Sequence, residues 1–309
     1  MAKEKTLIEM IDISKSYDGE IVLDEFNLNI KENEFITGKT FVLTGTLPNK
    51  SRDEATKIIE HNDIGNGYRY LVLNAPRLAA ELEPGQFVHV MVPALEKSAL
   101  RRPFSVFDAC DGKVTILYKS VGRGTAALNL AKPGETVLVE GPLGRGFPLD
   151  GDGAALLVRR GYGVAPLYFL AKRLIASGTN RPIKVFVGGR TKNDLLALDK
   201  FAELGVEIFT TTNDGSAGEK GFAVLPLDAQ IRKLRESGES FQLYTCGPDG
   251  LLKAVADRAM ELKVPGWISM DRHMICGVGA CFACIQKTVR GNSRCCVEGP
   301  VFPAEDLVW

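Results

Sequence analysis

The feature that most restricts the fold of this chain is a repeated alternation of strand-like and helix-like patterns that begins at Ala154. Short apolar runs such as IKVFVGG and FQLYTCG each precede a longer amphipathic stretch, such as PDGLLKAVADRAMELK. Strands joined by helices run parallel, and a parallel sheet needs helices on both faces. Residues 151–268 are therefore predicted to form a doubly wound α/β domain with a parallel sheet.

Residues 62–150 have a different rhythm. The strand-like runs YRYLVL, QFVHVMV, PFSVFDA, KVTILYK and ETVLVEG follow one another, bounded by Gly, Pro, Asn or Asp. Short strands separated by turn residues, with no long helix between them, are typical of antiparallel all-β folds. This region is predicted to be an antiparallel barrel.

Charge and hydropathy exclude some classes of partner. The chain has 38 Lys and Arg residues and 38 Asp and Glu residues, so no overall field favours nucleic acid. Its apolar runs fall well short of the roughly 20 residues that cross a bilayer, and the N-terminus lacks the apolar core of a signal peptide. We expect a cytoplasmic protein that binds neither nucleic acid nor membrane.

Cysteines are concentrated near the C-terminus, where five of the seven lie between residues 276 and 296. Cys276, Cys281 and Cys284 form a CxxxxCxxC pattern, followed by Cys295 and Cys296. This spacing is that of plant-type [2Fe–2S] centres, which take a fourth, distant cysteine. A zinc site is the alternative, but structural zinc usually uses two CxxC pairs and only one is present.

The residues around these cysteines also favour a cluster. Gly277 and Gly279 allow unusual backbone angles, so the chain can wrap closely around the irons. His273, three residues before Cys276, is expected to be a surface imidazole. Residues 269–309 show little periodicity and are predicted to form a small [2Fe–2S] domain.

Two segments of the predicted barrel indicate a flavin site. Arg102, Pro103, Phe104 and Ser105 resemble the RxxS strand of ferredoxin reductase flavoproteins. This resemblance implies that Arg102 pairs with the FAD diphosphate and that Ser105 lies near the flavin ring. An exposed strand arginine is the alternative.

The segment VGRGTAAL lies between a strand and a helical run. Its residues Gly122, Gly124 and Thr125 are predicted to form a phosphate-binding turn at a helix N-terminus.

Two turns in the α/β region fit the nicotinamide site of the same relatives. Gly161, Gly163 and Pro166 match a GxGxAP turn. Cys246, Gly247 and Pro248 match a CGP turn. Both turns follow strands, at the carboxyl ends where open α/β sheets bind ligands.

Arg159 and Arg160 depart from the pattern, since relatives carry small residues there. We expect these two side chains to obstruct the site and weaken nicotinamide binding; contact with phosphate is the alternative.

The first part of the chain does not fit the rest. Residues 1–37 resemble the start of an ATP-binding subunit of ABC transporters, and residues 38–60 resemble a fragment of the BRCT domain of DNA ligases. A phosphate loop is incomplete, because Asn33 stands where its first glycine is needed. The ligase-like piece would supply about one strand and one helix. Residues 1–61 are interpreted as an appended or chimeric segment without independent function.

The order of these motifs, ending in CGVGACFACIQKT and CCVEGPVF, resembles one family. Residues 62–309 are similar to the electron-transfer subunits of NAD-dependent (class 1B) bacterial dihydroorotate dehydrogenases, in the ferredoxin reductase superfamily. In that family the last cluster ligand precedes a [DE]GPVF segment, which selects Cys296.

The resemblance implies an oxidoreductase subunit of pyrimidine biosynthesis with FAD, a [2Fe–2S] cluster and NAD. Electrons would come from the FMN of a separate catalytic subunit, in a heterotetramer of two copies of each subunit. No residue for dihydroorotate chemistry is expected here. The alternatives are the flavin subunit of a ferredoxin:NADP oxidoreductase or sulfide dehydrogenase, and a non-catalytic zinc-bound binding module.

Overall fold

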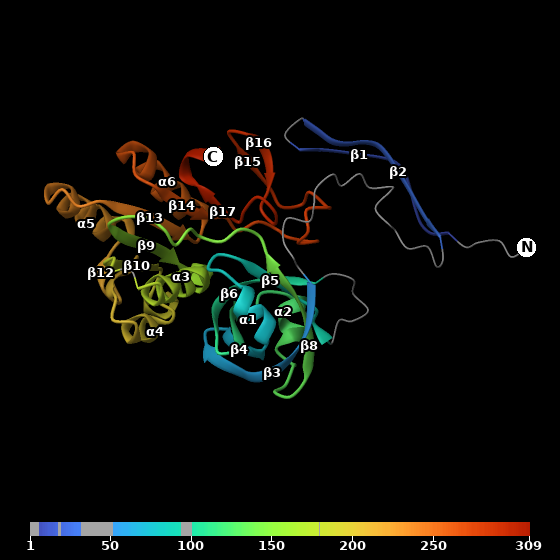
Figure 1. The fold of residues 1–309 in the computed structure, drawn as a ribbon, viewed down its shortest axis with the longest axis horizontal. Coiled ribbons are helices and arrows are strands. Elements are labelled where there is room, and N and C mark those ends of the chain that lie inside the picture. Colours follow the sequence, from blue (N-terminus) through green and yellow to red (C-terminus); the bar gives the residue numbers. More distant parts are fainter. Residues whose placement is uncertain (1–5, 18–19, 32–51, 94–100, 179) are drawn as a thin grey trace, which may run out of the picture. The chain divides into compact units, whose positions relative to one another are not determined.

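The computed structural model describes residues 6–17, 20–31, 52–93, 101–178 and 180–309 (Figure 1). The chain divides into two compact units, Met1–Thr46 and Leu47–Trp309. In the first unit, β1 (Thr6–Tyr17) pairs antiparallel with β2 (Glu20–Lys31). The junction of the two N-terminal resemblances, including Asn33 and Gly38, lies outside the described residues.

A closed antiparallel barrel of six strands, in the order β3-β4-β7-β6-β5-β8, opens the second unit. Its strands are β3 (Arg52–Gly65), β4 (Tyr68–Asn74), β5 (Phe87–Val90), β6 (Arg102–Cys110), β7 (Lys113–Lys119) and β8 (Thr136–Leu143), with the short helices α1 (Pro76–Glu81) and α2 (Arg123–Leu128). Alternate side chains such as Leu71, Val106 and Ile116 fill the interior and are fully buried. The predicted antiparallel barrel is confirmed.

The barrel begins earlier than the sequence suggested. The expected boundary at residue 62 falls inside β3, and the segment expected to be a helix of the ligase-like piece is a strand. Strand β3 pairs with both β4 and β8, so the barrel cannot close without it. Thr56 and Ile58 are its inward-facing, buried side chains.

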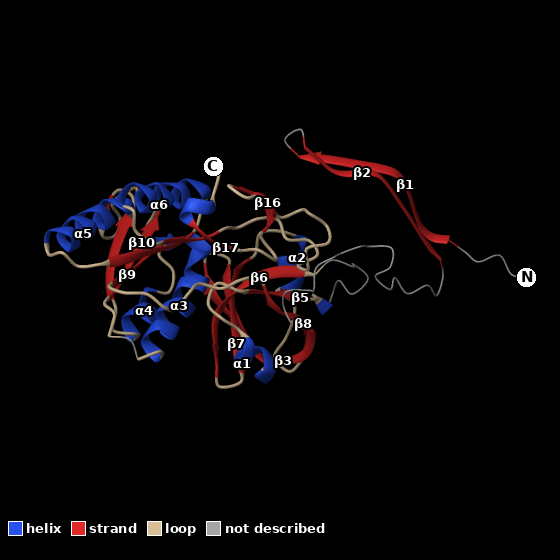
Figure 2. Cartoon of the chain, turned by 45° about the horizontal axis from the view of Figure 1, so that its top comes forward, coloured by secondary structure: helices blue, strands red, loops and turns tan. Residues whose placement is uncertain are grey.

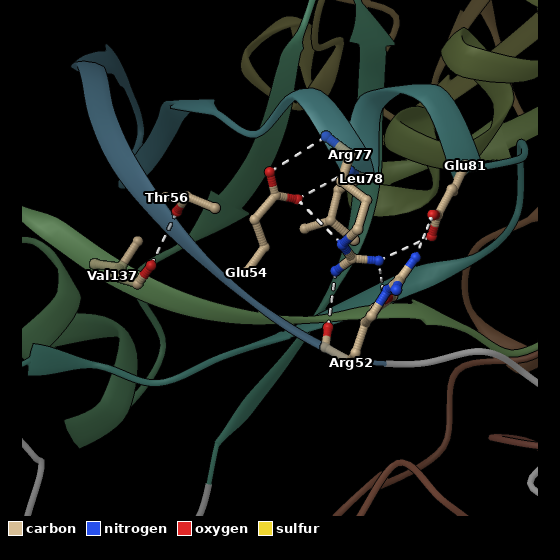
Figure 3. Close-up of polar contacts among 8 residues, drawn as sticks. Arg52, Glu54, Thr56, Arg77, Leu78, Glu81 and Val137 are labelled. Carbon is tan, nitrogen blue, oxygen red and sulfur yellow. Dashed lines mark hydrogen bonds and ion pairs between the residues drawn. The ribbon is translucent and has the colours of Figure 1, made fainter.

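Polar contacts also attach β3 to α1 (Figure 3). The carboxylate of Glu54 accepts hydrogen bonds from the backbone N–H groups of Arg77, at 3.2 Å, and Leu78, at 2.9 Å. Helix α1 has no side-chain cap of its own, so a residue of β3 satisfies its first N–H groups. The Arg77 guanidinium in turn donates to the backbone carbonyl of Arg52 at 2.8 Å.

A seven-stranded sheet follows, in the order β12-β11-β10-β9-β13-β14-β17. Its strands are β9 (Ala154–Arg160), β10 (Ile183–Gly189), β11 (Glu207–Thr212), β12 (Glu219–Lys220), β13 (Phe241–Cys246), β14 (Gly266–Ser269) and β17 (Val301–Pro303). All neighbouring strands are parallel except β14 and β17.

Helices cover both faces of this sheet (Figure 2). Helices α5 (Val224–Glu236) and α6 (Asp249–Leu262) share one hydrophobic core with the sheet. Helices α3 (Val164–Ala176) and α4 (Leu198–Glu203) share another, on the opposite side. The predicted doubly wound α/β arrangement is confirmed.

The cysteine-rich segment is built onto the sheet. The expected boundary between residues 268 and 269 lies inside β14, and β17 of this segment pairs with β14. A small hairpin of β15 (Ile285–Thr288) and β16 (Gly291–Arg294) projects from the segment. Short 3-10 helices are η2 (Gly161–Gly163), η3 (Lys192–Asp194) and η4 (Ala304–Asp306).

None of the helices in the described part of the chain combines the length and apolar character that spanning a bilayer would require.

Candidate electron-transfer site

Four cysteine side chains come together in the loop between β14 and β17. The backbone N–H of Cys281 donates to the Cys276 sulfur, and that of Cys296 donates to the Cys284 sulfur, each at 3.4 Å. The Cys296 thiol bonds to both Cys276 and Cys284, which lowers the pKa of Cys276 to about 4 and that of Cys284 to about 7. Thiolate is the form that binds metal, so this arrangement suits a metal centre.

Cys295 has a different environment from its neighbour. Its side chain is fully buried, and burial raises the pKa of its thiol to about 12. Its backbone N–H donates to the Cys284 carbonyl at 2.9 Å and so continues the pairing of the β15–β16 hairpin. The pKa of Cys296 is raised as well, but by the bonds of its thiol to the Cys276 and Cys284 sulfurs. The contacts therefore distinguish the two residues, since the Cys295 side chain acts as a buried packing group.

Two glycines leave room around the sulfurs. Gly277 and Gly279 have φ angles of 72° and 83°, in the left-handed region that favours glycine. A Cβ atom on Gly277 would lie 2.8 Å from the His89 ring, and one on Gly279 would lie 2.7 Å from the Val297 side chain. The loop can take this path only without side chains at these positions, which fits a chain wrapped around a small inorganic cluster.

His89 is a residue near the cluster loop that the sequence analysis missed. It lies on β5, is 1 % exposed, and its Nε2 has no hydrogen-bond partner among the described residues. Burial lowers the pKa of His89 to about 4. The only signal in the sequence is its alternate position in QFVHVMV, which does not tell which face the strand buries.

On the barrel, Arg102 and the predicted phosphate turn are in contact. Arg102 begins β6 and is half-buried, and a Cβ atom on Gly124 would lie 2.2 Å from its Nε. The Arg102 side chain therefore runs directly over Gly124 at the start of α2. Gly122 lies in open space, since no atom would come within 4 Å of a Cβ there.

Thr125 has a local role in this turn. Its hydroxyl accepts hydrogen bonds from the backbone N–H groups of Val121, at 2.9 Å, and Gly122, at 3.1 Å, and donates to the Gly122 carbonyl. The Thr125 side chain thus organises the turn beside Arg102.

The remaining residues of RPFS reach a junction of three regions. Pro103, Phe104 and Ser105 line a narrow cavity of about 70 Å³, together with Tyr162 and Cys246 at the sheet edge. Met274 and other residues of the segment that leads into the cysteine loop complete its wall. Barrel, sheet and cysteine loop therefore meet where electrons would have to pass between a flavin, a nicotinamide and a cluster.

Tyr162 was not expected at this junction. It is 47 % exposed, and burial of its hydroxyl together with the nearby Asp271 raises its pKa. It occupies the middle of the GxGxAP turn, where the sequence gives only an unspecified position.

The two predicted nicotinamide turns touch each other at the carboxyl edge of the sheet. A Cβ atom on Gly163 would lie 2.1 Å from the Cys246 carbonyl oxygen, so only glycine allows this approach. Gly161 has a φ angle of 58° and starts the turn. Pro166 is buried in the first turn of α3, and Pro248 caps α6 after Gly247.

Beside these turns lies a cavity of about 330 Å³. It is lined by Arg160, Gly188, Gly189, Asn213, Phe222, Ala223, Val224, Pro248, Gly250, Leu251 and Ala254. Arg160 is the one charged residue among these. The carboxylate of Asp249, at the start of α6, pairs instead with Arg272 at 3.0 Å.

Arg159 does not enter this cavity, so the expectation that it obstructs the site is wrong. Its side chain is completely buried on the other face of the sheet, where it donates to the Leu196 carbonyl and lies 5.0 Å from the Phe201 ring. Successive side chains of a strand point to opposite faces, which separates Arg159 from Arg160. Burial lowers the pKa of Arg159.

Comparison with known families agrees with this geometry. Residues 271–308 match the model of the iron-sulfur cluster binding domain of dihydroorotate dehydrogenase B. Residues 157–257 match an oxidoreductase NAD-binding domain, and residues 55–147 match an oxidoreductase FAD-binding domain.

Whole proteins give the same result. The chain is 40% identical over 262 residues to the dihydroorotate dehydrogenase B (NAD(+)) electron transfer subunit of Bacillus cereus (strain B4264), covering 81% of this chain and 96% of that protein. The chain belongs to the family of dihydroorotate dehydrogenase B electron transfer subunits. The subunit of Desulforamulus reducens is 36% identical over 247 residues, covering 78% of this chain and 92% of that protein.

A solved structure of a related enzyme has the same architecture. The structure of the NADH-dependent reduced ferredoxin-NADP oxidoreductase superimposes with a TM-score of 0.71 at 32% identity, covering 83% of this chain and 90% of that chain.

Within this electron transfer subunit family, the three matched regions account for the features above. The FAD-binding match begins at residue 55, inside β3, in agreement with a barrel that starts before residue 62. The NAD-binding match contains Arg160 and both of the predicted nicotinamide turns. The cluster-binding match contains all four converging sulfurs. The chain therefore carries binding domains for FAD, NAD and an iron–sulfur cluster.

Proposed function

We propose that this chain is the electron-transfer subunit of an NAD-linked dihydroorotate dehydrogenase of pyrimidine biosynthesis. It would pass electrons from the FMN of a catalytic partner subunit to NAD+, through a [2Fe–2S] cluster and FAD. The observation that carries the proposal is the set of side-chain contacts that link the four cysteine sulfurs. The segment that leads into their loop lines the cavity between the barrel and the carboxyl edge of the sheet.

Each group has a set of residues that would hold it. Cys276, Cys281, Cys284 and Cys296 would bind the cluster. Arg102, with the turn of Gly122, Gly124 and Thr125, would bind the FAD diphosphate, and Pro103, Phe104 and Ser105 would border the flavin ring. Gly161, Gly163 and Pro166, with Cys246, Gly247 and Pro248, would shape the nicotinamide site.

The order of these sites matches what the reaction requires. Bound FAD exchanges electron pairs with a nicotinamide and single electrons with an iron–sulfur cluster. Ser105 and Cys246 line one cavity, so the barrel and the CGP turn can place a flavin against a nicotinamide. Residues at the start of the loop that carries the sulfurs, such as Met274, form part of the wall of the same cavity.

The exposed edge of the cysteine loop is where we place the partner. Cys281 is exposed, and Ile275, the residue before Cys276, is 45 % exposed. An apolar edge beside a cluster suits a subunit that must bring its own FMN close. Two copies of each subunit, working in the cytoplasm, complete the proposal.

Anaerobic purification tests it directly. Iron, acid-labile sulfide and FAD should be present in a ratio of two irons and two sulfides to one flavin, as the [2Fe–2S] formula requires. Dihydroorotate should reduce NAD+ only after the catalytic subunit is added. Stoichiometric zinc without labile sulfide would show that the chain is a zinc-bound binding module instead.

A second candidate is a flavin subunit of a ferredoxin:NADP oxidoreductase, because the solved structure of such an enzyme is 32% identical to this chain. The curated relatives at 36–40% identity favour dihydroorotate. Reduction of NADP+ by ferredoxin, with no dihydroorotate-dependent activity after addition of the catalytic subunit, would favour this second function.

The N-terminal unit has no place in this scheme. We propose that it is an addition to the chain without activity of its own. Removing residues 1–46 should leave the flavin and iron content unchanged; a loss of either would assign it a role.

A further inference from the structure

Strand β5 forms the wall of the barrel that faces the cysteine loop. Its side chains alternate, as strand geometry requires. Val88 and Val90 belong to the core of the barrel, whereas Phe87 belongs to the core that contains Cys284 and Cys296. His89 is on the same side of the strand as Phe87, and their ring centroids lie 5.5 Å apart.

The His89 ring lies directly against the loop. A Cβ atom placed on Gly277 would be 2.8 Å from Cε1, 3.0 Å from Nδ1 and 3.2 Å from Nε2 of this ring. Gly277 follows the ligand Cys276, and the His89 imidazole and the Cys276 sulfur interact electrostatically. The absence of a side chain at Gly277 thus brings an imidazole next to the sulfur-bearing backbone.

The Nε2 atom of His89 lacks a hydrogen-bond partner among the described residues, although it is buried. Buried polar groups are almost always bonded, because an unpaired one has lost its water without replacement. A neutral imidazole carries its proton on one ring nitrogen, and our proposal places it on Nε2, which then needs an acceptor. The charged neighbour Arg101 is a cation, so it offers none. The missing partner should be an acceptor on the side of the loop.

We propose that His89 donates a hydrogen bond from Nε2 to a sulfur of the bound [2Fe–2S] cluster, on the side of Cys276. This inference rests on the ligand set of the proposed function. Hydrogen bonds to cluster sulfurs stabilise the reduced state, which carries one more negative charge, and raise the reduction potential. His89 would thereby make the cluster a better acceptor for electrons from the partner.

The histidine content of the chain allows a direct test. There are three histidines. His61 is engaged within the barrel, where its ring bonds to the Ala131 carbonyl and the Tyr118 hydroxyl. His273 is exposed, although it lies only three residues from Cys276. It is a matched control, since it has the same side chain near the same ligand.

The experiment uses the full-length chain labelled with ¹⁵N-histidine, purified anaerobically with its cluster and reduced. Pulsed EPR should show a hyperfine coupling from a histidine nitrogen to the cluster. The coupling should disappear in His89→Leu and persist in His273→Leu. A redox titration should give a lower midpoint potential for His89→Leu. We expect the ratio of reduced to oxidised cluster at a given potential to fall about tenfold, which corresponds to a shift of about 59 mV. His89→Gln keeps an N–H donor and should retain part of the difference.

The outcomes separate the two proposals. A loaded wild-type cluster without any histidine coupling overturns the inference, even if His89→Leu fails to load. A loaded His89→Leu with the wild-type midpoint also overturns it, and so does a shift equally large in His273→Leu. A wild-type chain that binds no iron and sulfide overturns the proposed ligand set, and with it this inference.

Discussion

The parallel sheet and the cysteine loop are neighbouring regions, and each is stabilised by a different kind of interaction. The sheet has its strands buried between two helical layers, and residues such as Phe186 and Leu243 are fully buried. The loop between β14 and β17 has little regular structure outside one small hairpin, and its centre is a group of cysteine sulfurs in contact with one another. These contacts lower the pKa values of Cys276 and Cys284. The sheet is stabilised by strand pairing and apolar burial within the chain, whereas the loop is shaped for a ligand.

This difference predicts which substitutions would disrupt each region. Loss of apolar contacts should unfold the sheet and everything attached to it, because β14 and β17 are the base of the loop. Loss of a sulfur should empty the loop and leave the sheet folded. The two regions can therefore be broken separately.

The largest effect is expected for Cys296→Ser, compared with Cys295→Ser. Cys296 bonds to Cys276 and Cys284, whereas Cys295 is a buried packing thiol. The Cys296 variant should lose its iron and acid-labile sulfide almost completely, while the Cys295 variant keeps them. Both should retain the far-ultraviolet circular dichroism of the native chain. Retention of the cluster in Cys296→Ser would remove this residue from the ligand set.

Phe186→Ala should break the other region. Phe186 is fully buried on β10 and stacks on Phe209 with ring centroids 4.9 Å apart. Removing a buried aromatic ring costs about 3–5 kcal/mol of unfolding free energy, which urea denaturation would measure. The folded fraction should still carry its full iron content. A selective loss of iron would mean that the sheet and the loop are not independent.

Arg159→Met should strengthen the sheet. The Arg159 guanidinium is completely buried, and two of its nitrogens, Nε and Nη1, lack partners among the described residues. Replacing a poorly compensated buried charge by an apolar side chain of similar length should stabilise the chain by about 1–4 kcal/mol. Thermal denaturation would show a higher midpoint. A lower midpoint would mean that this arginine contributes more than it costs.

The smallest effect is expected at the edge of the sheet, for Arg160→Gln. The Arg160 side chain lines the cavity next to the turns predicted to bind nicotinamide and would contact phosphate. The variant should bind ADP-ribose about tenfold more weakly, or about 1.4 kcal/mol, and adenosine with unchanged affinity. Calorimetric titration measures both.

Arg190→Gln is the control for this experiment, because Arg190 is 71 % exposed and pairs with Asp194. If Arg160→Gln bound ADP-ribose more tightly than the native chain, the expectation of obstruction would be correct for this residue.

The sequence predicted most of the sheet and barrel, because their strands carry regular patterns. It did not reveal β3, whose segment is rich in charged residues and buries only Thr56 and Ile58 among its first nine residues. A strand with one solvated face and few apolar residues gives a weak periodic signal. The resemblance to a ligase fragment suggested a helix there, and the strand pattern was too weak to contradict it.

The site was predicted in its motifs but not in its contacts. The spacing of the cysteines indicates a cluster, yet the packing of His89 against Gly277 depends on which face of β5 meets the loop. In the same way, the pleat of β9 decides that Arg160 enters the cavity and Arg159 does not. Such choices are made by tertiary packing, which local patterns do not contain.

The pairing of Ser269 with Val301, and the bond of 2.8 Å from the Met270 N–H to the Pro300 carbonyl, join the two ends of the cysteine loop at its base. Strand pairing therefore closes this loop before any metal binds, so metal binding does not have to supply the free energy of loop closure. Iron and sulfide would need to order only the interior of the loop. A chain from which the cluster has been removed should therefore stay folded and bind a new cluster without refolding.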